Sequence, residues 1–186
     1  MPILPPEPYL FPDSLFGAAE PLPEGLRQWW VLHTRPRAEK SLARACLSRC
    51  LPFFLPLCQR HTHSRGRTLT SHVPLFPGYL FLLADEQERV TALTTNLVMN
   101  CLPVPNQTEL QTDLAGVYRL MAAEMPVAAE ERLTPGTLIE IVRGPLAGLH
   151  GKVVKQGKHL RFVVEVHFLQ KGAWVEVEGW MLEKVS

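Results

Sequence analysis

The chain has 186 residues, of which 46% are hydrophobic, and this is enough to form one domain or two small ones with buried cores. Four unevenly spaced cysteines argue against a disulfide scaffold. We find no signal peptide and no apolar run long enough to cross a membrane. We therefore expect a reduced, cytoplasmic protein that does not bind membranes.

The formal net charge of +1 hides a strong asymmetry along the chain. Residues 27–84 carry nine basic residues and one acidic residue, whereas residues 1–26 carry four acids and no base. A basic segment of this kind favours a polyanionic partner, most simply nucleic acid. A basic surface that meets only solvent is the alternative that the charge leaves open.

The first segment, residues 1–26, contains seven prolines without a helical period, and we predict an extended, Pro-rich N-terminal arm. Its apolar residues suit packing along the next domain or contact with a partner. Residues 28–34 alternate around two tryptophans and predict a strand. A helix is expected to begin near Pro36 and to end before Pro52, with basic side chains outward.

Residues 53–59 predict a second strand, which leads into a polar segment rich in His and Arg around Gly66. We interpret this segment as a long hairpin, whose basic tip is either a phosphate contact or a mobile, solvated loop. The stretch PLFPGYLFLL (74–83) follows. Its prolines and glycine predict a bend, and the apolar run after the bend predicts a buried strand.

A short helix over residues 85–96 is expected next, capped by Asp85 and with Glu86 and Glu88 in its first turn. A fourth strand over 97–104 and a helix over 108–124 complete this part. The order predicts an α+β domain over residues 27–124, with an antiparallel four-stranded sheet and packed helices.

The composition and the hydrophobic pattern of the sequence change after this domain. Residues 125–133 are charged, lack a convincing period and are predicted to be a linker. Residues 134–186 contain about five short strands separated by glycine turns, a density typical of a small β-barrel.

Two motifs give this organisation a family resemblance. VRGPLAGLHGKVV (142–154) resembles the KOW motif of SH3-like barrels in ribosomal proteins and in NusG-type transcription factors. Together with the WWV strand, the basic helix, the basic hairpin and PLFPGYLF, it makes residues 28–186 resemble the NusG/RfaH family. SRGRTLTSHVPLFPGYLF is most similar to the RfaH branch, and the Pro-rich arm has no counterpart in either pattern.

The resemblance implies a transcription elongation factor that is not an enzyme and needs no cofactor. In the family, the first domain, called NGN, binds the clamp helices of the largest RNA polymerase subunit and the nontemplate DNA strand. The KOW domain recruits a further partner, which is Rho or a small ribosomal protein for NusG. We expect a monomer that modulates pausing, termination or antitermination; the direction of the effect, any recruitment sequence and the set of operons stay open.

Three sets of site residues follow from the resemblance. The polymerase-binding cavity is expected to be lined by His33, Phe76, Tyr79 and Phe81; burial of these rings in the domain's own core is the alternative. The nucleic-acid contacts are expected at Arg35, Arg37, Lys40, Arg44, Arg49, Arg65 and Arg67. The partner of the KOW domain is expected to bind Phe168, Leu169 and Lys171.

The sequence departs from the RfaH pattern in the second helix. RfaH carries a His-Thr-Thr-Thr run there that contacts a second part of the polymerase, whereas the matching residues here are Val90, Thr91, Ala92 and Leu93. This puts the second contact in doubt. The barrel of RfaH can also refold as a helical hairpin, but residues 161–168 (RFVVEVHF) favour β-structure so strongly that we predict a stable barrel.

Two other classes of function were weighed against this one. An enzyme or metal protein is disfavoured because the cysteines and histidines match no tight zinc spacing, and no catalytic triad, carboxylate pair or phosphate loop stands out. We predict no catalytic and no metal site. The remaining alternative is a KOW-type RNA-binding or ribosome-associated protein that never contacts polymerase, which would place the basic surface on the barrel.

Overall fold

The computed structural model describes residues 7–17, 27–64, 66–130, 136–156, 158–178 and 181–184. They form two compact units that interleave along the chain. The first unit combines Met1–Leu57 with Phe76–Gln107, and the second combines Cys58–Leu75 with Thr108–Ser186. No described helix is long and apolar enough to cross a membrane.

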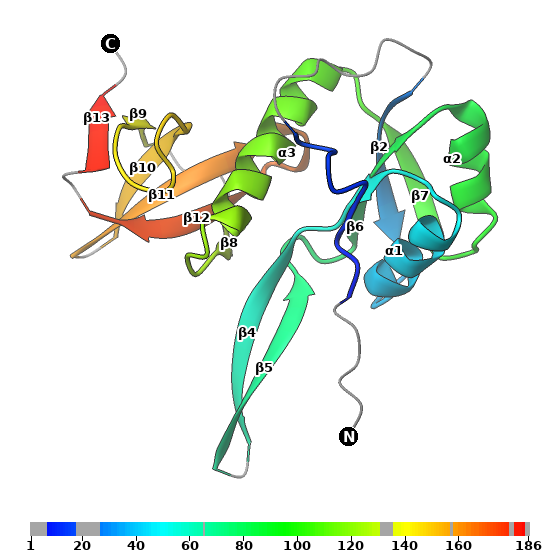
Figure 1. Ribbon diagram of the computed structural model, residues 1–186, viewed down its shortest axis with the longest axis horizontal. Coiled ribbons are helices and arrows are strands. Elements are labelled where there is room, and N and C mark those ends of the chain that lie inside the picture. Colours follow the sequence, from blue (N-terminus) through cyan, green and yellow to red (C-terminus); the bar gives the residue numbers. More distant parts are fainter. Residues whose placement is uncertain are drawn as a thin grey trace. The chain divides into compact units, whose positions relative to one another are not determined.

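The first unit is built on one antiparallel sheet with the strand order β1-β3-β6-β2-β7, of which Figure 1 labels β2, β6 and β7. The strands are β1 (Leu10–Phe11), β2 (Gln28–Thr34), β3 (Phe53–Phe54), β6 (Tyr79–Ala84) and β7 (Val98–Pro103). The four strands that the sequence predicts are present. The fifth strand, β1, comes from the Pro-rich arm, which the sequence patterns did not assign to a sheet.

Helices α1 (Glu39–Ser48) and α2 (Glu86–Leu93) contribute to a core on one face of this sheet. Leu42 and Cys46 of α1 are fully buried there with Leu32, Leu80 and Leu82 from the two central strands. Because side chains alternate along a strand, the neighbours of these residues point to the opposite face. That opposite face carries the aromatic residues of the predicted cavity.

The ends of the two helices have local causes. Helix α2 begins with a capping box, in which Asp85 accepts the backbone N–H of Glu88 and Glu88 accepts that of Asp85. Helix α1 begins at Glu39 rather than near Pro36, because Arg37 takes a left-handed conformation with φ of 61°. It ends at Ser48, so Cys50 lies outside the helix and is exposed.

The predicted second strand is divided in two. β3 ends at Phe54, and β4 (Leu57–Ser64) starts after Pro56 and pairs with β5 (Arg67–Pro74). The predicted long hairpin is therefore confirmed, and Figure 1 shows it as a two-stranded ribbon. Gly66 at its tip has φ of 73°, a conformation that glycine adopts without strain.

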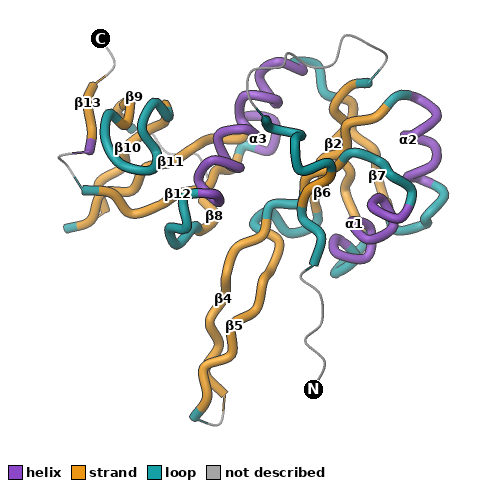
Figure 2. The backbone as a smooth tube through the Cα atoms, in the orientation of Figure 1, coloured by secondary structure: helices purple, strands orange, loops and turns teal. Residues whose placement is uncertain are grey.

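The rest of the second unit consists of α3 (Gln107–Ala122) and a six-stranded antiparallel sheet in the order β13-β9-β10-β11-β12-β8 (Figure 2). A short 3₁₀ helix, η1 (His167–Leu169), joins β11 to β12. The strands are β8 (Ala128–Glu130), β9 (Thr137–Ile141), β10 (His150–Gln156), β11 (His159–Val166), β12 (Lys171–Val177) and β13 (Leu182–Lys184).

Part of the predicted linker is ordered structure. Residues 128–130 form β8, which pairs with Gly172, Ala173 and Trp174 of β12. The pairing with β12 supplies an order that the sequence of these three residues does not signal, and the linker over 125–133 stays a prediction. The proposed domain ranges, 27–124 and 134–186, remain predictions.

Candidate functional site

The bend in PLFPGYLF is a tight turn across Phe76 to Tyr79. The backbone N–H of Tyr79 donates to the carbonyl of Phe76 at 3.2 Å, and Gly78 has φ of 87°. Proline in the second position and a left-handed glycine in the third are the requirements of a type II turn. The turn places Tyr79 at the first position of β6.

Two other segments hold this turn in place. The backbone N–H of Gly78 donates to Oε1 of Glu39 at 2.7 Å, and its carbonyl accepts the N–H of Thr34 at 2.8 Å. Glu39 is 7% exposed at the start of α1. Glu39 is the one acidic residue of the basic segment 27–84, and nothing in the neighbouring sequence indicates a partner so far along the chain.

His33 and Tyr79 form an aromatic pair beside the turn. They are register partners in β2 and β6, and their rings stack with centroids 5.3 Å apart. Both residues are partly exposed. A Cβ atom at Gly78 would lie 3.5 Å from the His33 ring, so the turn backbone runs against this ring. The pair thus offers a supported aromatic surface to solvent.

The other two residues of the predicted cavity lie beneath the surface. Phe81 is fully buried and Phe76 is 1% exposed, and their rings meet edge to face at 6.4 Å. Strand alternation puts Phe81 on the same face as Tyr79. Of the four predicted residues, His33 and Tyr79 are accessible to solvent, while Phe76 and Phe81 are buried.

The predicted nucleic-acid residues of the first unit follow the end of β2. Arg35 and Arg37 are exposed in the turn before α1, and the backbone N–H of Arg35 bonds to the carbonyl of Leu97 at 2.9 Å. Lys40 is half-buried in the first turn of α1. Cationic side chains on a turn whose backbone is fixed suit contacts with phosphate groups. Such contacts position a nucleic-acid strand without reading its base sequence.

The remaining basic residues differ in how free their charges are. Arg44 is paired with Glu7 at 2.6 Å, and Arg49 donates to the carbonyl of Ala45 at 3.0 Å. Arg67 is exposed on the hairpin strand β5, while Arg65 lies outside the described residues. Among the predicted nucleic-acid residues of the first unit, Arg35 and Arg37 are therefore the best-placed candidates.

The predicted partner site surrounds η1 in the second unit. Phe168 and Leu169 are half-buried in this helix, and Lys171 begins β12. Gln170 between them has φ of 53° and donates from its side chain to the carbonyl of His167 at 2.7 Å. This hydrogen bond closes the turn between His167 and Gln170.

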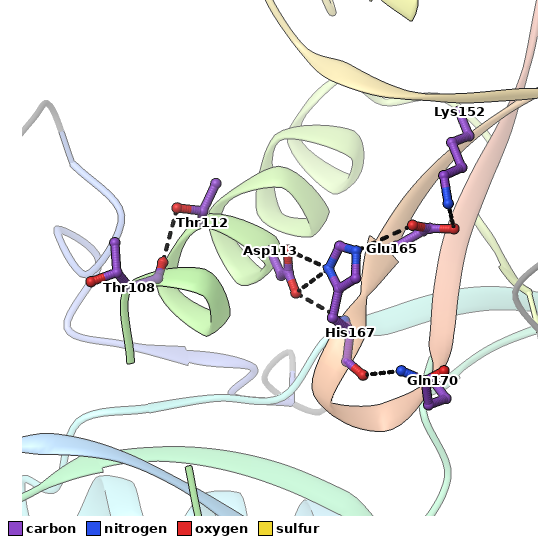
Figure 3. A network of polar contacts seen from close by, with 7 residues as sticks. All are labelled: Thr108, Thr112, Asp113, Lys152, Glu165, His167 and Gln170. Atoms are coloured by element: carbon purple, nitrogen blue, oxygen red, sulfur yellow. Dashed lines mark hydrogen bonds and ion pairs between the residues drawn. The ribbon is translucent and has the colours of Figure 1, made fainter. Parts of the chain in front are cut away.

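A polar network ties α3 to the start of this loop (Figure 3). Asp113 of α3 accepts the backbone N–H of His167 at 2.9 Å and lies 3.1 Å from its ring Nδ1. Nε2 of the same ring is 3.3 Å from Glu165, which also binds Lys152 at 2.8 Å. Sequence reasoning missed Asp113, because a lone acid on a helix carries no signal of a distant partner.

The network shifts the proton affinities of its members. Burial raises the pKa of Asp113, although its hydrogen bonds with His167 oppose this effect. Burial lowers the pKa of His167, but the hydrogen bond and charge of Asp113 and the charges of Glu165 and Glu109 outweigh it, so the pKa is raised. A protonated His167 between two carboxylates is the favoured state at mildly acidic pH.

The positions that depart from the RfaH pattern lie on α2. Val90 is 48% exposed, whereas Ala92 is buried in the core of the first unit. The hydroxyl of Thr91 donates to the carbonyl of Gln87 at 2.9 Å. This helix therefore presents an apolar side chain where the pattern has a polar one.

The family model described as "Transcription termination factor nusG" matches residues 27–128, which is more than half of the chain. The chain belongs to the NusG family. It is thus a transcription elongation factor of a non-enzymatic family whose members act on RNA polymerase. The matched range contains both the aromatic pair of His33 and Tyr79 and the turn that carries Arg35 and Arg37. Among curated proteins, none matches the chain.

Several solved structures match this NusG-family chain, among them the following two. One, titled "Domain interaction in Thermotoga maritima NusG", has 16% sequence identity and a TM-score of 0.49, and the match covers 86% of this chain and 98% of that one. The other, "Crystal Structure of MjSpt4:Spt5 complex conformation B", has 15% identity and a TM-score of 0.24, with 85% and 97% covered.

Proposed function

We propose that the aromatic pair of His33 and Tyr79 is the site at which this factor binds the clamp helices of the largest RNA polymerase subunit. The observation that carries the proposal is the stacked, partly exposed pair on a type II turn, underlain by Phe76 and Phe81. An amphipathic helix lays apolar side chains on such a surface, and rigid aromatic residues dominate the binding energy of interfaces.

The nontemplate DNA strand would bind next to this site. Arg35 and Arg37 follow β2 directly after His33, so one short segment supplies both the aromatic contact and two exposed cations. A factor that holds polymerase and a DNA strand at once would change pausing, termination or antitermination. The family match supports an elongation factor and does not choose among these effects.

The second unit would recruit a further protein through the loop around η1. Its sheet carries the KOW-like glycine segment between β9 and β10, and Phe168 and Leu169 offer partly exposed apolar surface. Rho or a small ribosomal protein is the proposed partner. The dense strand pairing of β10, β11 and β12 supports a stable β-fold rather than a helical hairpin.

Capture of core RNA polymerase by the full-length chain tests the main proposal. We expect Tyr79→Ala to weaken binding by about tenfold or more, since central aromatic contacts contribute roughly 2 kcal/mol. Tyr9→Ala is the matched control, because Tyr9 is an exposed tyrosine of the same unit, with 40% of its surface accessible. Equal capture by wild type and Tyr79→Ala would overturn the proposal, and RNA binding without any capture would favour the RNA-binding alternative.

A salt titration tests the DNA contact. Arg35→Gln and Arg37→Gln should each weaken binding to an elongation complex and flatten the dependence on salt, because fewer counterions are released. Arg143→Gln removes the same charge from an exposed position in the second unit and serves as control. Unchanged affinity of the first two variants at low and high salt would refute the contact.

A further inference from the structure

The Pro-rich arm is attached to the first unit by backbone pairing. Strand β1 pairs antiparallel with β3, so that Leu10 faces Phe54 and Phe11 faces Phe53. The carbonyl of Tyr9 also accepts the backbone N–H of Leu55 at 2.7 Å. These bonds fix the register of the arm on the edge of the sheet.

Two phenylalanines of the arm strengthen this attachment. Phe16 stacks on Trp29 with centroids 6.2 Å apart and meets Phe54 edge to face at 5.0 Å. Phe11 packs against the core cluster that includes Leu42 and Leu80. By strand alternation Phe54 and Phe53 point to opposite faces, so the arm holds the sheet edge from both sides.

The anchored arm brings a carboxylate to the basic surface of α1. Glu7, three residues before β1, places Oε2 at 2.6 Å from Nη1 of Arg44, whose other terminal nitrogen donates to Ser41 at 3.2 Å. Arg44 is one of the residues expected to bind nucleic acid. The arm has four acids and no base, whereas residues 27–84 carry nine bases and one acid.

We propose that the arm is an intramolecular competitor of nucleic acid, in which the carboxylate of Glu7 occupies Arg44 until a backbone phosphate replaces it. The inference rests on the proposed nucleic-acid contact of the first unit. Pairing of β1 and stacking of Phe16 keep Glu7 at a high effective concentration beside Arg44. The ion pair is partly exposed, with 53% of the Arg44 side chain accessible, so it lowers affinity without blocking binding.

Binding of a labelled single-stranded oligonucleotide to the full-length chain tests this competition. Glu7→Gln should raise the affinity by about twofold to fivefold, the range expected for loss of an exposed ion pair. It should also steepen the logarithmic salt dependence by about 0.7, the increment for one additional phosphate contact to a single strand. In the Arg44→Gln background, Glu7→Gln should change neither quantity.

Asp13→Asn is the matched control, because it removes the same charge from an exposed position of the same arm. It should raise the affinity less than Glu7→Gln does. An equal rise would overturn the competition and show a general effect of arm charge. Glu7 and Asp13 lie outside the paired residues of β1, so we expect the pairing to survive either substitution, and the near-ultraviolet spectrum of the tryptophans checks that Phe16 stays in place.

A further variant separates this inference from the proposed function. If Arg35→Gln weakens oligonucleotide binding but Glu7→Gln leaves it unchanged, the nucleic-acid contact stands and the competition is refuted. If the chain binds no oligonucleotide, or if Arg35→Gln and Arg37→Gln both leave binding unchanged, the nucleic-acid function itself fails and the competition fails with it.

Discussion

The carboxylate of Asp113 binds His167 twice, through the backbone N–H at 2.9 Å and the ring Nδ1 at 3.1 Å. One acid therefore sets both the position of the loop before β12 and the orientation of its histidine. Since the loop contains Phe168 and Leu169, the proposed partner surface depends on a residue of α3.

The raised pKa of His167 predicts that this attachment weakens at alkaline pH. The folded chain binds the proton more tightly than the unfolded chain, so the stabilisation is complete below about pH 6.5 and is lost as the pH rises through the raised pKa. Because 47% of the side chain is exposed, we expect a loss below about 1 kcal/mol. Urea unfolding of wild type and His167→Gln at about pH 6 and pH 8 measures it.

The stability difference between wild type and His167→Gln should shrink between these two pH values. His72→Gln is the control for loss of an imidazole, because His72 is exposed on β5 and lies outside this network. A pH-independent difference for His167→Gln would contradict the prediction.

The close approach of α3 to β11 predicts that Gly116 tolerates no side chain. A Cβ atom at this position would lie 2.8 Å from Cγ1 of Val164. Alanine favours a helix over glycine by about 1 kcal/mol, but overpacking costs about 1–3 kcal/mol, so Gly116→Ala should destabilise the chain. Thermal unfolding measures the change.

Truncation of Val164 to alanine should reverse the sign of the stability change that Gly116→Ala causes. In the Val164→Ala background, Gly116→Ala is expected to stabilise the chain by up to about 1 kcal/mol, because only the helix preference then remains. Equal destabilisation in both backgrounds would show that contact with Val164 is not the cause.

The buried carboxylate of Glu39 predicts a link between α1 and the proposed polymerase site. Glu39→Ala leaves the backbone N–H of Gly78 without its acceptor, which costs about 1–3 kcal/mol. The turn that carries Tyr79 should loosen, so capture of polymerase should fall as well. Glu39→Gln keeps an acceptor oxygen in place, so it should reduce stability and polymerase capture less than Glu39→Ala does. Equal losses from the two variants would argue against the hydrogen bond as the cause.

The capping box of α2 predicts a local loss of stability. Asp85→Ala should lower the free energy of unfolding by about 1 kcal/mol, because an N-terminal N–H of the helix loses its acceptor. Asp85→Asn retains a capping oxygen and should be close to wild type. Chemical denaturation compares the two, and equal losses would assign the effect to charge instead of capping.

The features that the sequence predicted well depend on neighbours in the chain. Asp85 caps the helix that follows it, and Pro77 with Gly78 makes the turn within four residues. Gly66 likewise marks the tip of the hairpin. Such signals act over one turn of backbone, so a single sequence reveals them.

The features that the sequence missed depend on residues far apart in the chain. Glu39 accepts a hydrogen bond from Gly78, and Asp113 accepts one from His167. Neither acid has a neighbour in the sequence that indicates this partner. Strand β8 has the sequence Ala-Ala-Glu, which has no β preference of its own. For the candidate site, strand alternation predicted that His33, Tyr79 and Phe81 share one face, but it did not decide between the cavity and the core for the phenylalanine rings.

Strand β1 also covers an edge of the first sheet that β3 would otherwise expose. An open edge offers unpaired N–H and C=O groups to any extended chain, and apolar edges are sites of aggregation. Without the arm, β3 would present two phenylalanines at such an edge. By pairing there, the arm replaces this edge with a strand of only two residues that is followed at once by Pro12, which has no N–H to donate to another chain.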